Sequence, residues 1–513
     1  MRKTNFYIPE YVKIILICLF IFLLQYIVLP LHQLDTDFFW HYKLGEEIVN
    51  LHTISLKNTM SFLQGTQWIP QEWLYEVFIY LLVSAGGMIA YCLLFACNSV
   101  LQILLARKMS KPSCLLLFAV VSCYLLVFSP RNTGNRPAEF SVYLFPLMIY
   151  LYQSKSRFNP LCYLLLGIFT ANFHGGCILV MTAIYIILFF SDVALDVYEH
   201  VSSGISYYFK KLLYIFLFLA SCCINPAGLK LLVTIPKISN LSSTAYISEW
   251  QPVKNTYILC IFAFLVCISI GYTLCKKGIS RSDLPVMLVM TALLVLGFCS
   301  LKAFIIFDIV WMCYGYKYLE NMLLDIFQNS HFLRVLYRKI PLVLLAVLPA
   351  AILFFAEISH TAIQVSGMDF ISYANSKTSR KILDQLSTNY TDDTRILASY
   401  NNGNYLILND MKCFVDSRQW PYAKELGTCD ALDDLLYVCQ HPTDFDSITG
   451  FLDKYQFDYI WCAGELDLDI YLSNDPEYEL ILTDTSGENA DSGSEHIYEL
   501  GNSKKQSLWR RVK

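Results

Sequence analysis

Long apolar runs separated by short polar segments dominate the first 358 residues of the chain. A helix needs about 20 apolar residues to cross the hydrocarbon core of a bilayer. The pattern therefore predicts about 11 membrane-spanning helices. They lie near residues 11–31, 75–106, 113–129, 138–154, 158–172, 175–192, 211–225, 256–275, 284–300, 303–321 and 340–358. The first run is too long for the core of a signal peptide and has no small-residue cleavage site, so it predicts a retained helix.

The run at 75–106 is longer than a single crossing requires. Gly86 and Gly87 lie within it and predict a break in the helix. Two arrangements remain open: a segment that dips into the membrane and is followed by one crossing, or two separate crossings. The run at 158–172 is short for a crossing helix.

Lys and Arg give an independent test of the topology, because cytoplasmic loops are enriched in them. If 75–106 crosses once, every basic cluster falls on the same face as the N-terminus, which predicts that this face is cytoplasmic. The clusters are Arg2, Lys3 and Lys13; Arg107, Lys108 and Lys111; Lys155 and Arg157; Lys210 and Lys211; Lys276, Lys277 and Arg281; and Arg334, Arg338 and Lys339. Eleven crossings then place residues 359–513 on the extracytoplasmic side.

Composition separates this last segment from the apolar part, residues 1–358. Residues 359–513 hold 25 acidic and 13 basic side chains, whereas residues 1–358 hold 17 acidic and 25 basic ones. The pattern predicts strands at 395–400, 405–408, 412–416, 458–462, 479–485 and 496–500, and an amphipathic helix at 444–454. We therefore expect a small, water-soluble α/β domain after the membrane helix bundle. Its four cysteines lack CxxC spacing, so no zinc site is predicted and a disulfide stays open.

Acidic residues and a histidine follow the first apolar run directly, in "LDTDFFWH". One hypothesis is that Asp35 or Asp37 is a general base, with His41 beside it. Another is that the two aspartates share Mg²⁺ or Mn²⁺, which prefer oxygen ligands. A third is an interfacial cap, in which Phe38 and Trp40 anchor at the lipid headgroups and the aspartates are solvated.

Other polar stretches fall on the same predicted face and supply further candidate residues. Arginine offers a planar fork that matches phosphate oxygens, and lysine adds a point charge. On this basis Arg131, Arg136 and Lys302 are candidate phosphate ligands, although arginines there could instead contact lipid headgroups. His174 could be a ligand or a structural histidine, while Gly175 and Gly176 favour close helix packing. Asp308 is a candidate partner of Lys302, and "INPAG" (224–228) predicts a turn.

The order of these stretches resembles a group of bacterial polytopic proteins of the GT-C glycosyltransferase superfamily. The superfamily includes oligosaccharyltransferase catalytic subunits, protein O-mannosyltransferases and aminoarabinose transferases. The resemblance covers residues 34 to about 418. It depends on "DTDFFWHYKLGE", "TISLKNTMSFLQGTQWIPQEWLYEVFIYLLVSAGG", "NRPAEFSVYLFPL", "NFHGG", "INPAGLKLL", "ISEWQP" and "NGNYLIL…KCFVDSR". The group's usual RPQ is RPA here (136–138), and its DGR is DSR (416–418).

The resemblance implies a GT-C-like bundle (1–358), with a catalytic first outside loop at 32–74, followed by the soluble domain (359–513). It implies a sugar donor on a polyprenyl phosphate or diphosphate, with Asp35 or Asp37 serving the acceptor nucleophile. Glu72 and Trp73 match an "EW" that closes the same loop, and Glu249 belongs to the matching "ISEWQP". The implied location is a bacterial cell membrane, and the implied partners are membrane lipid and the donor, with no nucleic acid.

We therefore expect an integral-membrane glycosyltransferase whose donor phosphate is bound by Arg131, Arg136 or Lys302. No glycine-rich nucleotide fingerprint occurs, as expected for a lipid-linked donor. The alternative is a non-catalytic lipid- or glycan-binding protein, or a transporter, on the same scaffold. A transporter would be expected to show two related halves with paired broken helices, and the sequence has no such repeat.

Overall fold

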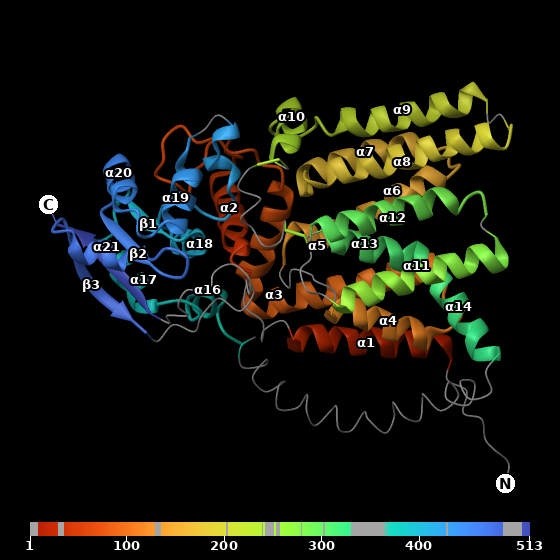
Figure 1. Cartoon of the computed structure of the whole chain (residues 1–513), viewed down its shortest axis with the longest axis horizontal. Coiled ribbons are helices and arrows are strands. Elements are labelled where there is room, and N and C mark those ends of the chain that lie inside the picture. Colours follow the sequence, from red (N-terminus) through yellow and green to blue (C-terminus); the bar gives the residue numbers. More distant parts are fainter. Residues whose placement is uncertain are drawn as a thin grey trace, which may run out of the picture.

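The computed structural model has a long helix bundle at one end and a smaller mixed unit at the other (Figure 1). It describes residues 9–28, 35–128, 135–201, 204–238, 240–241, 251–252, 257–278, 280–300, 303–329, 365, 367–426, 429–485 and 505–512. The helices before residue 330 are α1 (Glu10–Val28), α2 (Asp37–Leu51), α3 (Trp73–Ser110), α4 (Leu115–Phe128), α5 (Pro137–Ser141), α6 (Leu144–Gln153), α7 (Asn159–Phe173), α8 (Cys177–Tyr198), α9 (Ile205–Ser221), α10 (Leu229–Ile238), α11 (Tyr257–Lys277), α12 (Leu284–Cys299), α13 (Phe304–Val310) and α14 (Tyr316–Asn329), with a π-helical turn (Trp311–Gly315) between the last two.

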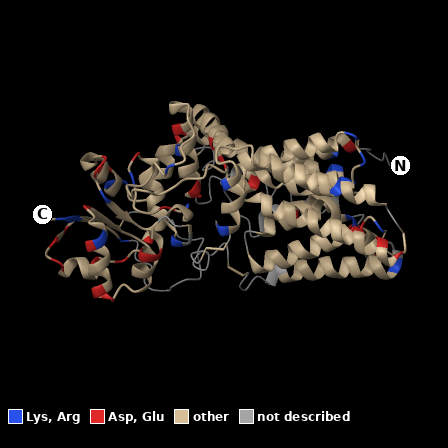
Figure 2. Ribbon diagram, turned by 90° about the horizontal axis from the view of Figure 1, so that it is seen from above, with Lys and Arg blue, Asp and Glu red and all other residues tan. Residues whose placement is uncertain are grey.

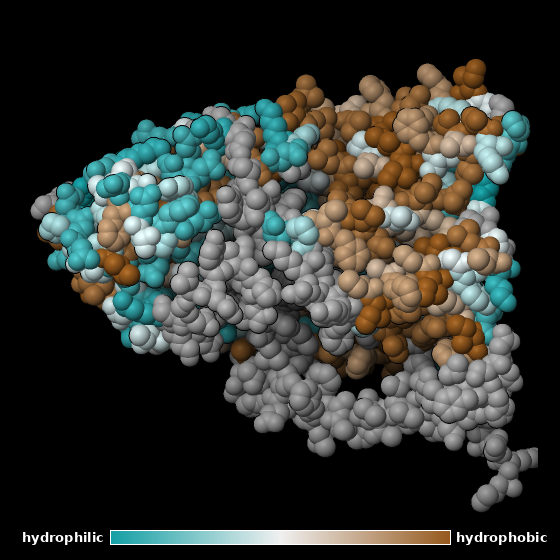
Figure 3. All heavy atoms as spheres, in the orientation of Figure 1, coloured by the Kyte–Doolittle hydropathy of each residue, from teal (hydrophilic) through white to brown (hydrophobic). Residues whose placement is uncertain are grey.

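The visible surface of the bundle is largely apolar. Charged residues gather at its two ends and leave the middle almost uncharged (Figure 2), and its visible sides are hydrophobic (Figure 3). Within the described chain, α3 and α8 are long and apolar enough to span a membrane, and three shorter apolar helices accompany them. Helices form at ten of the predicted spans, whereas 340–358 lies outside the described residues. The number of crossings stays a prediction.

Helix α3 bends at Gly87, where the sequence predicts a break. Gly87 has a φ of 56° and a ψ of −144°, a conformation that is open to glycine and costly for other residues. The part before the bend packs on α2, where Gly45 meets the backbone of Glu76. The part after the bend packs on α1, and Arg107 pairs with Glu10 at 2.8 Å. The bend at Gly87 thus lets one helix pack against α2 near the candidate site and against α1 in the body of the bundle.

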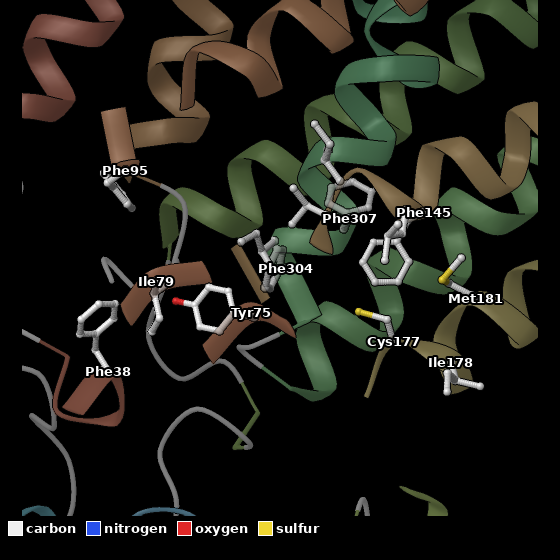
Figure 4. Close-up of a cluster of buried hydrophobic side chains, with 14 of the residues drawn as sticks. Phe38, Tyr75, Ile79, Phe95, Phe145, Cys177, Ile178, Met181, Phe304 and Phe307 are labelled. Carbon is white, nitrogen blue, oxygen red and sulfur yellow. The ribbon is translucent and has the colours of Figure 1, made fainter. Parts of the chain in front are cut away.

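The core of the bundle is continuous with the elements that carry the candidate site. Phe38 of α2, Tyr75 of α3 and Cys177 of α8 are at most 4% exposed, and Phe304 of α13 is fully buried. Figure 4 shows these side chains in one buried cluster, which draws on helices far apart in the sequence. The helix ends near the site are therefore held by hydrophobic packing, which stabilises roughly in proportion to the apolar area buried.

The C-terminal unit is the small α/β structure that the sequence predicts. It contains α16 (Phe370–Asn375), α17 (Arg380–Asn389), β1 (Ile396–Ala398), α18 (Tyr400–Leu408), α19 (Ala431–Gln440), α20 (Phe445–Tyr455), β2 (Tyr459–Cys462), α21 (Asp469–Asn474), β3 (Tyr478–Asp484) and β4 (Gln506–Arg511), with short 3₁₀ turns at Trp420–Tyr422 and Lys424–Leu426. Its sheet has the order β1-β2-β4-β3; β1 and β2 are parallel and the other pairs are antiparallel.

Two of the predicted strands are wrong. Residues 405–408 belong to helix α18, which Ser399 caps by accepting a hydrogen bond from the Asn402 N–H. A four-residue apolar run does not distinguish a buried helix from a strand, so the cap decided the outcome. Residues 412–416 form no sheet strand, and only Cys413 makes a bridge, to Ser61 in the first loop. The predicted strand at 496–500 lies outside the described residues, and β4 was not predicted.

The segment predicted as the first outside loop, 32–74, contains a helix. Helix α2 begins at Asp37 and ends at Leu51, followed by His52 with a φ of 54°. Its buried face carries both aromatic and polar residues, so it has no clean apolar stripe of the kind that identifies a helix in sequence. The tail cysteines that the sequence left open, Cys413, Cys429, Cys439 and Cys462, are free thiols.

Candidate functional site

The acidic pair lies at the N-terminus of α2. Asp37 is the first residue of this helix, and the Asp35 carboxylate accepts a hydrogen bond of 3.0 Å from the Asp37 N–H. Carboxylates are favoured at a helix N-terminus because the backbone N–H groups there carry partial positive charge. The local sequence thus places two carboxylates side by side at the start of a buried helix.

Arg136, the N-cap residue of α5, joins the two carboxylates. Its Nε and Nη2 atoms both donate to Asp35, the latter at 2.7 Å, and Nη2 lies 3.1 Å from Asp37 Oδ2. The side chains of Asp35, Asp37 and Arg136 are 11%, 21% and 13% exposed. The group has a net charge of −1, and Asp37 is its more accessible carboxylate.

This geometry disagrees with the interfacial-cap interpretation. Phe38 is fully buried against Tyr91 and Phe370, and Trp40 is 6% exposed, so neither side chain anchors at a headgroup region. The aspartates are ion-paired rather than solvated. The pair also fits poorly as a shared Mg²⁺ or Mn²⁺ site, because the Arg136 guanidinium already contacts both carboxylates where a cation would bind.

A second polar group follows one turn along α2. His41 Nε2 lies 3.8 Å from Glu72 Oε2, and His41 Nδ1 lies 3.5 Å from Glu76 Oε1. His174 Nε2 approaches the other oxygen of Glu72 at 3.5 Å, and His174 Nδ1 lies 2.7 Å from Ser141 Oγ. His41 of α2, Glu72 at the N-cap of α3 and His174 at the C-cap of α7 are therefore close together.

Glu76 belongs to this group, and the sequence reasoning did not single it out. It lies one turn after Glu72 on α3, and its side chain is fully buried. The available signal was the i, i+4 spacing of two glutamates in "QEWLYE", which places both carboxylates on one helix face.

Trp73 and Gly175 hold the surrounding helix ends together. Trp73 Nε1 donates a 2.6 Å hydrogen bond to Asn172 Oδ1, and the Gly175 N–H donates to the Gln71 carbonyl at 3.0 Å. A Cβ on Gly175 would lie 3.0 Å from the Gln71 Cβ, so the packing role predicted for this glycine is confirmed. In this structure Trp73 fastens α3 to α7.

Three candidate residues, Arg131, Glu249 and Lys302, lie outside the described residues, so their roles stay predictions. Asp308 is buried in α13. The "INPAG" stretch forms the predicted turn, in which the Asn225 side chain accepts from the Ala227 N–H at 2.8 Å and Gly228 has a φ of 55°.

The "DSR" motif of the C-terminal unit is buried against the first loop. Arg418 donates to Asp416 through Nε at 2.8 Å and Nη2 at 2.6 Å, and Nη2 also donates to Asn58 Oδ1 at 2.7 Å. Tyr422 donates its hydroxyl to Asp416. Burial raises the pKa of Asp416, but the Arg418 charge and these hydrogen bonds outweigh it and hold the pKa below its usual value. The motif therefore joins the two units.

A cavity of about 640 Å³ lies at the other end of the bundle, away from the acidic pair. Lysines 155, 210, 211 and 317 line it together with several tyrosines. Its polar groups are largely engaged, since Lys317 pairs with Asp283 at 2.8 Å and Asp192 accepts hydrogen bonds from Tyr152 and Tyr207.

The described chain thus combines a helix bundle, an acidic pair at one end of it and a small α/β unit. No family model matches the sequence, and a search of curated proteins finds no match. Solved structures do match, and they confirm the fold that the resemblance implied.

These structures are oligosaccharyltransferases of Archaeoglobus fulgidus. The apo form matches with a TM-score of 0.56 and 11% identity, over 88% of this chain and 69% of that chain. AglB in complex with an inhibitory peptide and a dolichol-phosphate matches with a TM-score of 0.52 and 12% identity, over 92% and 72% of the two chains. A form tethered to an acceptor peptide through a disulfide bond also has a TM-score of 0.52. At such identities the likeness establishes the fold alone.

Proposed function

We propose that this chain is an integral-membrane glycosyltransferase that moves a sugar from a polyprenyl-phosphate or polyprenyl-diphosphate donor to an acceptor hydroxyl. The observation that carries the proposal is the half-buried acidic pair, Asp35 and Asp37, at one end of a GT-C-like bundle. One neighbour of similar fold binds a dolichol-phosphate, which supports a lipid-linked donor. The basic residues gathered at the opposite end support a site on the extracytoplasmic side.

In the proposed reaction Asp37 acts as the base. It accepts the proton of the acceptor hydroxyl as the oxygen attacks the anomeric carbon, and the bond from that carbon to the phosphate oxygen breaks. The lipid phosphate leaves in this same single displacement, from the face opposite to the attack, so the configuration inverts. Asp37 is assigned this step because it is the more exposed carboxylate of the pair. Asp35 orients it through the shared Arg136 and the Asp37 N–H.

Arg136 and the residues around it complete the proposal. Arg136 keeps the pair together and contributes positive charge toward the donor phosphate, with Arg131 and Lys302 as further phosphate ligands. His41, Glu72, Trp73, His174 and Glu249 are proposed to line the substrate region. No cation is required at the acidic pair, because Arg136 already supplies charge there.

The test is sugar transfer by purified full-length protein with a panel of polyprenyl-phosphate and polyprenyl-diphosphate sugars. Asp37→Asn keeps size but removes basicity, so transfer should fall about 10²- to 10⁴-fold while the protein still folds. Asp410→Asn is a matched control: Asp410 has a φ of 61°, which asparagine tolerates, and it pairs with Lys43 of the same helix α2. The control should transfer normally.

Two outcomes would change the proposal. Near-normal transfer by the Asp35→Asn, Asp37→Asn double variant would remove the catalytic role and favour a non-catalytic lipid- or glycan-binding protein. Partial rescue of the milder single variant by excess Mn²⁺ would show instead that the two aspartates share a cation.

A further inference from the structure

We propose that His41, Glu72 and Glu76 bind one divalent transition-metal ion, of which Zn²⁺ is the best fit, at a site separate from the acidic pair. The three side chains are buried and come from two helices, α2 and α3. An imidazole and two carboxylates are ligands that Zn²⁺ accepts. The proposal concerns metal binding and does not depend on sugar transfer.

The distances between the ligand atoms fit one shared ion. One ligand atom from each residue lies within 4.8 Å of the other two. The nearest pairs are 3.5 Å, from His41 Nδ1 to Glu76, and 3.8 Å, from His41 Nε2 to Glu72. Ligands at about 2.0–2.2 Å from a tetrahedral ion lie about 3.3–3.6 Å apart, so small side-chain rotations close the site. The ion would bind one of the two ring nitrogens of His41. The glutamate that faces the other ring nitrogen (Glu72 at Nε2, Glu76 at Nδ1) would rotate its carboxylate toward the ion.

Glu76 gives an independent reason to expect a ligand. Its side chain is fully buried, and neither carboxylate oxygen accepts a hydrogen bond from any residue that the structure describes. A buried carboxylate is costly unless hydrogen bonds or a counter-charge compensate it. Glu72 adds a second carboxylate beside it. The His41 imidazole supplies at most one positive charge, and the Arg418 charge that also acts on Glu76 is already paired with Asp416. A divalent cation at this point would neutralise both carboxylates.

The surrounding packing holds these ligands in place. Gly45 brings α2 onto the backbone of Glu76, because any larger residue there would clash with the Glu76 carbonyl. The Trp40 ring lies over the His41 ring with centroids 3.5 Å apart. His174 approaches the second oxygen of Glu72, and such a partner orients a metal-binding carboxylate. The ion would thus fasten the start of α3 to α2, one turn from Asp37.

The alternative is a metal-free arrangement in which protons shared with His41 neutralise the two glutamates. Metal analysis distinguishes the metal-bound arrangement from the metal-free one. The full-length protein is purified in detergent, equilibrated with Zn²⁺ and freed of loosely held ions before the measurement. We expect about one Zn²⁺ per chain in the wild type and a loss of at least about fivefold in Glu76→Gln. Glu320→Gln is the matched control, since Glu320 is also buried but accepts hydrogen bonds from Ser113 and Cys114 elsewhere in the bundle. It should keep the ion.

The Asp35→Asn, Asp37→Asn double variant separates this site from the acidic pair and should also keep the ion. X-ray absorption at the zinc edge of the wild type adds a measurement that does not depend on any variant folding, and should show one imidazole among oxygen ligands. The proposal is overturned if the wild type holds no stoichiometric ion, if the ligand shell has no imidazole, or if the double variant loses the ion while Glu76→Gln keeps it.

Discussion

Arg136 determines the net charge and the geometry of the acidic pair. Without it, two carboxylates at the start of α2 would repel each other, and with it they form one ion-paired group of net charge −1. The sequence predicted Arg136 as a candidate phosphate ligand, and the structure shows that part of its fork is already used by Asp35 and Asp37. In the proposed reaction Arg136 both holds the two carboxylates together and contributes positive charge toward the donor phosphate.

Arg136→Lys tests that double role, because lysine keeps the charge but cannot reach two carboxylates with a planar fork. We expect transfer to fall about tenfold or more, since a charge-assisted hydrogen bond contributes about 1.5–3 kcal/mol. Donor affinity should weaken as well. The measurements are turnover and donor binding on the purified protein, with Arg107→Lys, at the Glu10 ion pair, as the control. Unchanged values for both quantities would leave Arg136 without a role in catalysis.

At the scale of elements, the site depends on how closely α2 and α3 approach. Asp37 and His41 lie one turn apart on α2, and Glu72 and Glu76 lie at the start of α3, so the spacing of the two helices sets every distance between them. Gly45 is the point of closest approach. A Cβ added there would lie 2.1 Å from the Glu76 carbonyl oxygen.

Gly45→Ala should therefore force the two helices apart. Overpacking of this kind typically costs about 1–3 kcal/mol, so the thermal unfolding temperature of the purified protein should drop. Sugar transfer should fall together with it, because the His41 and Glu72 side chains separate. The control is Gly450→Ala in α20, where nothing lies within 4 Å of the added Cβ. That variant should be at least as stable as the wild type, because alanine favours a helix over glycine. Equal stability of both variants would contradict the close packing at Gly45.

At the scale of the whole molecule, the C-terminal unit is attached to the first loop rather than simply following the bundle. The Cys413 N–H donates to the Met60 carbonyl at 3.1 Å, and Trp68 stacks on Trp420 with centroids 5.0 Å apart. Arg418 lies over the Trp68 ring and bonds Asp416 and Asn58. The loop that follows α2 is thus ordered by contacts with residues more than 300 positions later.

This attachment predicts a particular pH dependence. The pKa of Asp416 is lower in the folded protein than in the unfolded chain, so its contribution to stability is complete above the unfolded value and is lost as pH falls through the folded one. We expect the Asp416 contribution to be constant from pH 7 to about 5 and to decline below about 4. Asp416→Asn should cost about 3–5 kcal/mol at pH 7, because it leaves Arg418 buried without its partner.

Unfolding of the full-length protein, followed by tryptophan fluorescence, measures this contribution. Exposed Asp384 in α17 provides the Asp→Asn control, which should leave stability unchanged at pH 7. An Asp416→Asn protein as stable as the wild type at pH 7 would show that the motif does not hold the units together.

The sequence by itself predicted an apolar part followed by an acidic part, and most of the helices. Hydrophobic runs of membrane length and the switch to an acidic segment follow from composition and periodicity, which are local properties. The α/β character of the tail was predicted correctly, as were the break at Gly86-Gly87 and the turn at 224–228. The candidates Asp35, Asp37 and His41 could be found because they are close together in the sequence.

Only the tertiary structure decided which distant groups meet. The bonds from Arg136 to the acidic pair and the approach of His174 to Glu72 join residues about 100 positions apart. Residues 405–408 form a helix because Ser399 caps it, and Cys413 bridges to the first loop instead of joining the sheet. The i, i+4 spacing of Glu72 and Glu76 indicates that both glutamates lie on one helix face. It does not reveal that this face is buried or which side chains of other helices share it. Such contacts depend on how whole helices pack, and no local pattern encodes them.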